Sequence, residues 1–278
     1  MRQTLLILSL SSLMVTACEE LEQPATNQFV VEAFITSGEP INDIKIKESS
    51  SLDTEVLEDN PISDATIRLF SDNSEVTLDY NPITSKYFLS EGDFNIEVGG
   101  EYSIQIDLGD VSATAQTIVP EQPTGLVLTD TLLEVPTLRI SFSLQSQFEE
   151  LFENERSTLT WDAVPGRMFY VVIESRVDAI DPILPSEIPE EVAETISSFR
   201  FVSEPSEDTS FDIIAVALET YGKHVAKVYT VNEEYAALFN SATQDSRDLN
   251  EPPSNVMNAL GIFSSFAVDS VEFEVREN

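Results

Sequence analysis

The stretch Glu101–Asp110, EYSIQIDLGD, decides the fold class of this chain. Apolar residues stand at every second position from Tyr102 to Leu108, and polar residues stand between them. Because successive side chains of a β-strand point to opposite faces, this pattern predicts a strand with one buried and one exposed face. Gly109-Asp110 predicts a turn, and the alternation continues through Val111–Pro120, VSATAQTIVP. We therefore expect two neighbouring antiparallel strands.

The same alternation recurs on both sides of this stretch. Before it, strands are predicted at 28–36 (QFVVEAFIT), Ile44–Ile46 and Ala65–Leu69. After it, strands are predicted at 138–144, Leu159–Trp161 and Phe169–Ile173, and as two segments between Ser210 and Val231 joined near a Tyr-Gly turn. Helical spacing is confined to 185–199 (PSEIPEEVAETISSF) and 232–242 (NEEYAALFNSA), each between predicted strands.

These patterns predict a mainly β protein with two tandem antiparallel β-sandwich domains and short helical insertions. Glu121-Gln122-Pro123 is typical of a short linker, so the expected domains are residues 28–121 and 122–278. The second domain carries the helical insertion and a C-terminal extension. Its segment Ile180–Pro205 is expected either to shape a binding surface or to cover a sheet edge.

The composition excludes several classes of partner. The chain has 50 acidic against 14 basic residues, a formal net charge of −36. Such a surface repels phosphate backbones and anionic headgroups, so we expect no nucleic-acid binding. The charge is spread along the chain and 42% of residues are hydrophobic, which favours a folded acidic protein over a disordered one.

The N-terminal residues predict export and a lipid anchor. One positive charge, Arg2, precedes about a dozen mostly apolar residues, which is typical of a signal peptide over residues 1–17 and too short to span a bilayer. Val15-Thr16-Ala17-Cys18 resembles the bacterial lipobox, in which the cysteine thiol receives a diacylglyceryl group and the new amine a fatty acyl chain such as palmitate. The sole cysteine, Cys18, is thus the predicted lipidation site. The alternative is an ordinary signal peptide with an incidental cysteine.

Residues 18–27 are expected to form an acidic tether between the lipid and the first strand. Glu19, Glu20 and Glu22 resemble the signal that sends some lipoproteins to the outer face of the outer membrane, and a solvated tether is the alternative. Two or more acyl chains give stable membrane binding. Together with the acidic residues after Cys18, this predicts a lipoprotein of the cell outer membrane that faces the exterior.

No catalytic residue is predicted. The single histidine, His224, lies in a predicted strand without a partner motif, so we expect it on the strand surface. The His and Cys ligands of a zinc site are missing. Ser71–Glu75 and Asp245–Glu251 are weak calcium candidates that read better as solvated turns. A pair of carboxylates could still form a glycosidase site, which sequence cannot test. Trp161, Tyr170 and Phe211 are expected in the core.

Several segments resemble one family. They are the lipobox cysteine, QFVVEAFITSGEP, ISDATIRLF, GEYSIQIDLGD, ATAQTIVP and the tail EPPSNVMNALGIFSSFAV at 251–268. Together they are similar to Bacteroidota-type outer-membrane lipoproteins with domain of unknown function 4249, although Ala33 stands where we expect glycine. The resemblance implies an immunoglobulin- or transthyretin-like domain, then a fibronectin type III-like domain whose last hairpin lies at 211–231. It also implies association with TonB-dependent receptors and no catalytic residue.

Three functions remain open at this point. The first is a non-catalytic binding or accessory lipoprotein beside a TonB-dependent transporter, for nutrient capture or receptor support. The second is a structural or adhesive surface lipoprotein with the sandwiches as spacers. The third, and least favoured, is a carboxylate-based hydrolase. We therefore expect no enzyme and no cofactor other than the covalent lipid on Cys18.

Overall fold

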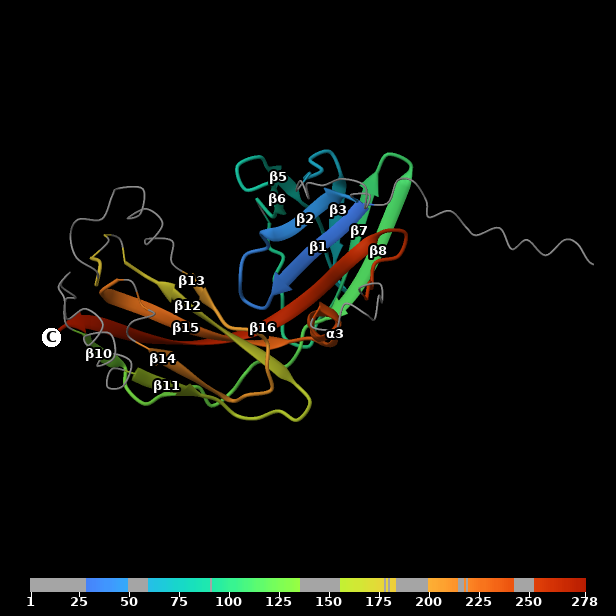
Figure 1. Ribbon diagram of the computed structural model, residues 1–278. Coiled ribbons are helices and arrows are strands. Elements are labelled where there is room, and N and C mark those ends of the chain that lie inside the picture. Colours follow the sequence, from blue (N-terminus) through green and yellow to red (C-terminus); the bar gives the residue numbers. More distant parts are fainter. Residues whose placement is uncertain are drawn as a thin grey trace, which may run out of the picture.

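The computed structural model describes residues 29–49, 60–90, 92–135, 156–177, 179, 181–183, 200–214, 218, 220–242 and 253–278. Two β-sandwiches lie next to each other, and one long strand runs through both (Figure 1). The structure thus confirms the predicted mainly β fold class. No helix in the described part of the chain is both long and apolar enough to cross a bilayer.

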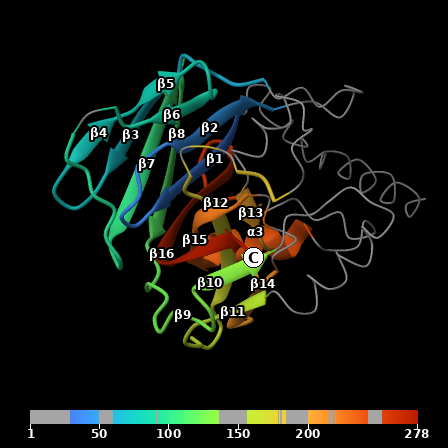
Figure 2. The ribbon, with the colours of Figure 1, turned by 90° about the vertical axis from the view of Figure 1, so that its left-hand side faces the viewer.

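The N-terminal sandwich contains eight strands of its own. They are β1 (Phe29–Thr36), β2 (Asp43–Glu48), β3 (Thr66–Phe70), β4 (Glu75–Thr77), β5 (Asp79–Asn81), β6 (Lys86–Phe88), β7 (Glu101–Leu108) and β8 (Val111–Ile118). One sheet has the order β1-β2-β6-β5 and the other β4-β3-β7-β8, and Figure 2 shows them facing each other. The strands β7 and β8 pair antiparallel across the predicted turn, with Leu108 opposite Val111.

The second sandwich is built from the later strands. They are β9 (Val127–Leu128), β10 (Leu132–Val135), β11 (Arg156–Thr160), β12 (Met168–Ser175), β13 (Arg200–Val202), β14 (Ser210–Ile214), β15 (Gly222–Val231) and β16 (Leu260–Glu277). One sheet has the order β13-β12-β15-β16, with β10 also pairing with β16, and the other has the order β14-β11-β9. The helix α3 (Glu233–Ala242) follows β15, as the sequence predicts.

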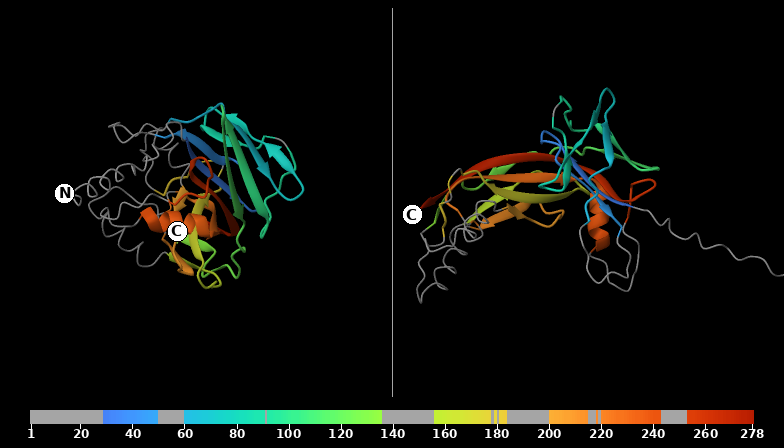
Figure 3. Two further views of the ribbon diagram at one scale, coloured as in Figure 1. Left: turned by 90° about the vertical axis from the view of Figure 1, so that its right-hand side faces the viewer. Right: turned by 90° about the horizontal axis from the view of Figure 1, so that it is seen from above.

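The strand β16 joins the two sandwiches. Its first part pairs parallel with β1, from Leu260 opposite Val30 to Phe266 opposite Thr36, and its end pairs parallel with β10. Along its other edge β16 pairs antiparallel with β15, from Phe266 opposite Val231 to Val275 opposite Gly222. Figure 3 (right) shows β16 extending from beside α3 to the C-terminus. One continuous sheet therefore runs from β13 to β5, with two parallel pairings that period-2 alternation does not predict.

The predicted boundary at residue 121 stays a prediction. The structure adds that β16, which lies in the predicted second domain, supplies buried side chains to both cores. Phe263 and Ala267 belong to the N-terminal core, and Phe273 and Val275 belong to the second core.

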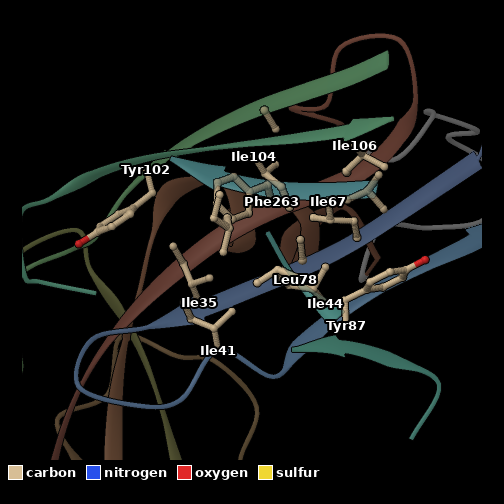
Figure 4. Close-up of a cluster of buried hydrophobic side chains, with 14 of the residues drawn as sticks. Ile35, Ile41, Ile44, Ile67, Leu78, Tyr87, Tyr102, Ile104, Ile106 and Phe263 are labelled. Carbon is tan, nitrogen blue, oxygen red and sulfur yellow. The ribbon is translucent and has the colours of Figure 1, made fainter. Parts of the chain in front are cut away.

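The N-terminal core fills the space between its two sheets. Figure 4 shows these side chains pointing toward one another, with Ile35 and Ile44 on one side and Ile67, Ile104 and Ile106 on the other. The alternation read in EYSIQIDLGD is confirmed, because Tyr102, Ile104 and Ile106 are buried while the polar residues between them are half-buried. Burial of such side chains contributes roughly 1.5–3 kcal/mol each to folding.

The second core surrounds the predicted core aromatics. Trp161 is buried and packs edge-on against Phe169, with ring centroids 5.8 Å apart. Phe211 packs against the same cluster. The core-packing prediction is confirmed for both Trp161 and Phe211.

One predicted pairing is wrong. The strands β14 and β15 were expected to form a hairpin near Tyr221-Gly222, but β14 pairs with β11 in one sheet and β15 with β12 and β16 in the other. The burial pattern gives the reason. Seven of the ten residues of β15 are buried, as expected for a strand with packing on both faces, whereas β14 is mostly half-buried or exposed.

The expected surface position of His224 is also wrong. Its side chain is fully buried, stacks on Phe273 with centroids 5.3 Å apart, and places Nδ1 3.1 Å from the Gly222 carbonyl oxygen. The loss of water around the ring lowers the pKa of His224 below its usual 6.5, and the hydrogen bond with Gly222 opposes this only in part. A neutral imidazole is therefore part of the second core.

Candidate functional site

A groove of about 510 Å³ lies on the continuous sheet where the two sandwiches meet. It is on the face that points away from both cores. Along β1, Ala33 and Ile35 enter the N-terminal core while Phe34 and Thr36 line the groove. Along β15, Val228 enters the second core while Lys227 and Tyr229 line the groove. Its volume lies in the range of small-ligand sites.

Aromatic rings form the floor of this groove. Tyr170 and Tyr229 are stacked, with centroids 4.6 Å apart and an interplanar angle of 2°. Phe266 meets Tyr170 edge-on at 5.7 Å and Tyr235 at 5.1 Å, and Phe34 meets Tyr235 at 5.7 Å. Neighbouring rings fix one another's orientation. Tyr229 and Phe266 are themselves buried, so the rings that a ligand can reach are those of the half-buried Phe34, Tyr170 and Tyr235.

A chain of four charged side chains crosses the floor. Lys227 Nζ lies 2.6 Å from Glu39 Oε1 and 3.2 Å from Glu174 Oε2, and Arg176 Nη2 lies 3.3 Å from the same Glu174 oxygen. The Tyr229 hydroxyl donates to Glu39 Oε1 at 3.1 Å. Glu39 belongs to the N-terminal sandwich and the other members to the second, so the chain connects the two walls of the groove.

The N-terminal wall carries a further ion pair. Lys86 Nζ contacts Asp43 Oδ1 at 2.5 Å, and both side chains are about half-exposed. Burial raises the pKa of the Tyr235 hydroxyl, and the negative charge of Asp43 raises it further. Tyr235 therefore stays a neutral phenol at physiological pH, and the six charged groups of the groove sum to zero.

A buried polar cluster holds α3 and its Tyr235 in position. The side chain of Asn232 donates to Thr117 Oγ1 of β8 at 2.6 Å and to Ser265 Oγ at 3.3 Å. Its oxygen accepts from the Ser264 hydroxyl at 2.6 Å and from the Tyr235 backbone N–H at 3.2 Å. The last bond is an N-cap, which satisfies one of the free N–H groups at the start of a helix.

Most of the predicted site residues lie elsewhere. Cys18, with the predicted signal peptide 1–17 and tether 18–27, lies outside the described residues, as do the calcium candidate Asp245–Glu251, the predicted helix at 185–199 and the predicted strand at 138–144. Lipidation of Cys18 therefore stays a prediction. Ser71–Glu75 forms the turn between β3 and β4, in which Ser71 N–H donates to the Ser74 carbonyl at 2.9 Å. Within the described ranges, His, Cys, Asp and Glu side chains form no group of three that would hold a metal ion.

In the predicted surface segment Ile180–Pro205 the structure describes residues 181–183 and 200–205. There β13 pairs antiparallel with β12, so residues 200–202 cover that edge of the sheet. The strand β13 is thus the outer strand of this sheet, and the role of the segment as a whole stays a prediction.

The sequence predicts Tyr170 in the core and, apart from Lys227, gives no indication of the other groove residues. Tyr170 does pack on Tyr229, and it also lines the groove. One signal in the sequence indicates this groove. Lys227 is the only charged residue in the apolar segment VAKVYTV at 225–231, and it faces the same side of the strand as Tyr229. A charge at such a position indicates a paired group or a site.

The chain is similar to a two-domain fibronectin type III segment of chicken tenascin, with 12% identity, a TM-score of 0.25, and 89% of this chain and 99% of that one covered. It is also similar to domains A168–A170 of titin, with 11% identity, a TM-score of 0.22, and 90% and 66% covered. TM-scores this low carry no argument, so the description of the fold depends only on the strand pairing given above. No curated protein matches the chain. The model of the family named Domain of unknown function (DUF4249) matches residues 18–272, and the chain therefore belongs to that family.

Proposed function

We propose that this protein is a lipid-anchored lipoprotein of the outer membrane that binds a ligand in the groove and works beside a TonB-dependent transporter. The observation that carries the binding role is the groove itself, a polar hollow with a rigid aromatic floor and charged side chains from both sandwiches. The lipobox-like Val15–Cys18 supports the anchor, and the resemblance to envelope lipoproteins supports the transporter.

The groove suits recognition better than chemistry. Its charged groups pair with one another through Lys227, Glu39 and Glu174, which fixes their positions before a ligand arrives. Prearranged groups lower the cost of ordering on binding, which is a general route to affinity. The proposal assigns no catalytic role to any residue.

Recovery of the native complex tests the transporter part of this proposal. The tagged full-length chain is purified from detergent-solubilised membranes, and the proteins that accompany it are identified by mass spectrometry. A Cys18→Ser variant, which cannot be lipidated through a thioether, is the control. We expect a TonB-dependent receptor to accompany the native chain and to be depleted with the variant. Repeated recovery of the native chain without a transporter would contradict the proposal.

One observation favours a second candidate, a carboxylate-based hydrolase. Glu39 and Glu174 contact the same ammonium group, so their oxygens lie within about 6 Å of each other, close to the separation used by glycosidases. However, such enzymes need one protonated carboxyl group and a free gap for the scissile bond, and here Lys227 lies in that gap. Turnover of a glycan that is abolished by Glu174→Gln would establish this candidate.

A further inference from the structure

We infer that the ligand of the groove is a short peptide with free termini, a zwitterion whose carboxylate pairs with Arg176 and whose ammonium pairs with Asp43. This inference rests on the proposed binding function and names its ligand class. It follows from the charges of the groove, their exposure and the aromatic floor.

The groove is electrically balanced in a strongly acidic molecule. Three cations, Lys86, Arg176 and Lys227, face three carboxylates, whereas the whole chain has 14 cations against 50 acidic residues. The field of the molecule opposes the approach of an anionic ligand. A zwitterion has no net charge to be repelled, and it carries both signs that the groove can pair.

The exposure of the charged groups shows which ion pairs a ligand can replace and which it cannot. Lys227 is only 14% exposed and contacts two carboxylates, so removing its partners would leave a buried charge unpaired. Arg176 is 55% exposed and Asp43 is 53% exposed, each in a surface ion pair. Exposed ion pairs contribute little to stability, so a ligand can replace their partners at little cost.

An uncharged ligand fits the same surface less well. A neutral glycan would displace water from Arg176, Asp43 and Lys86 and would provide no opposite charge to compensate for the lost hydration. A peptide carboxylate instead gives Arg176 a charge-assisted bond that a guanidinium can make in bidentate form. An apolar side chain of the peptide then rests on the rings of Tyr170 and Tyr235.

Calorimetric titration of the mature lipidated chain in detergent micelles tests this inference. The probes are alanyl-leucyl-alanine, the same tripeptide acetylated and amidated at its ends, maltotriose, and trigalacturonate. We expect the free tripeptide to bind and the capped form to bind at least about tenfold more weakly, since capping removes both charges that pair with Arg176 and Asp43. Added salt is expected to weaken binding of the free tripeptide.

Paired variants locate the binding. Arg176→Gln is expected to weaken tripeptide binding about tenfold or more. Arg156→Gln is the matched control, because Arg156 is 50% exposed, pairs with a single carboxylate at 3.6 Å, and lies on β11 outside the groove. Thermal unfolding of both variants confirms that each is folded. Equal loss in the two variants would overturn the inference.

The outcomes separate the ligand class from the proposed function. Equal binding of free and capped tripeptides, or binding of none of the four probes, overturns the peptide inference. Binding of maltotriose or trigalacturonate that Arg176→Gln weakens also overturns it, but leaves the groove as a binding site. Transporter recovery is measured separately, so its failure alone counts only against the proposed partnership.

Discussion

At the scale of single residues, Gly261 decides how closely the two sandwiches join. It lies opposite Val31 where β16 pairs with β1, and its φ of +107° belongs to the region that favours glycine. A Cβ atom at this position would lie 2.0 Å from the Val31 carbonyl oxygen and 2.7 Å from the Val31 nitrogen. Both obstacles are backbone atoms, so the strands themselves would have to separate.

We predict that Gly261→Ala lowers the free energy of unfolding by about 3 kcal/mol or more, because it combines backbone strain with a clash inside a sheet. Gly38→Ala is the control, since its φ is +71° but nothing lies within 4 Å of the added Cβ. It is expected to cost about 1–2 kcal/mol. Urea unfolding measures both, and equal losses would show that the close approach is not the cause.

His224 gives the second residue-scale prediction. Its pKa is lowered in the folded chain, so between the folded pKa and about 6.5 the unfolded chain binds a proton that the folded chain does not. The contribution of His224 to stability is therefore complete above about pH 6.5 and falls as the pH drops toward the folded pKa, by at most about 1.4 kcal/mol per pH unit.

Because the chain has one histidine, His224→Gln isolates this effect. We expect urea unfolding between pH 7.5 and 5.5 to show a smaller loss of stability in the variant than in the native chain. The remaining slope belongs to the carboxylates. Identical slopes in the two proteins would mean that His224 is not held neutral by burial.

At the scale of elements, α3 depends on one buried side chain. Asn232 caps the helix and connects β15 with Thr117 of β8 and with Ser264 and Ser265 of β16. All four side chains are buried. Removal of the amide takes away the acceptor of the Ser264 hydroxyl and the donor to Thr117, although the Thr117 and Ser265 hydroxyls keep their mutual hydrogen bond of 2.9 Å.

We predict that Asn232→Ala lowers the free energy of unfolding by about 2–4 kcal/mol, the sum of the lost helix cap and of the buried Ser264 hydroxyl that loses its acceptor. The exposed Asn73, at the turn after β3, provides the control, and Asn73→Ala is expected to change stability by about 0.5 kcal/mol or less. A loss in Asn232→Ala no larger than in the control would show that the cluster does not hold α3.

The elements also show what sequence can predict. Period-2 alternation predicts β1, β2, β3, β7, β8, β11 and β12, because a strand with one buried face has an apolar residue at every second position. Alternation does not report which strand lies alongside. The strands β14 and β15 are successive in the chain and were placed in one hairpin, yet they lie in different sheets.

At the scale of the whole molecule, the groove could not be predicted, because its parts come from distant segments. Phe34 and Asp43 lie near the start, Lys86 lies on β6, Tyr170 on β12 and Phe266 near the end. No local pattern marks residues that meet only through the pairing of β16 with β1 and β15. The mainly β class was predictable because it depends on local alternation alone.

The shared strand predicts cooperative unfolding of the two sandwiches. Ile67 lies in the N-terminal core and Trp161, the sole tryptophan, lies in the second core. We expect Ile67→Ala, which removes about 2–5 kcal/mol, to lower the urea midpoint of Trp161 fluorescence as much as that of far-UV circular dichroism. An unchanged fluorescence midpoint would show that the sandwiches unfold independently, as separate domains.

The central proposal is that lipid fixes this molecule to an envelope membrane, where its groove works beside a transporter. Mass spectrometry of the chain purified from native membranes tests it most directly. The account predicts an N-terminal peptide that starts at Cys18, with a diacylglyceryl thioether and an acylated amine. A mature chain that carries an unmodified thiol, or that starts at another residue, would contradict it.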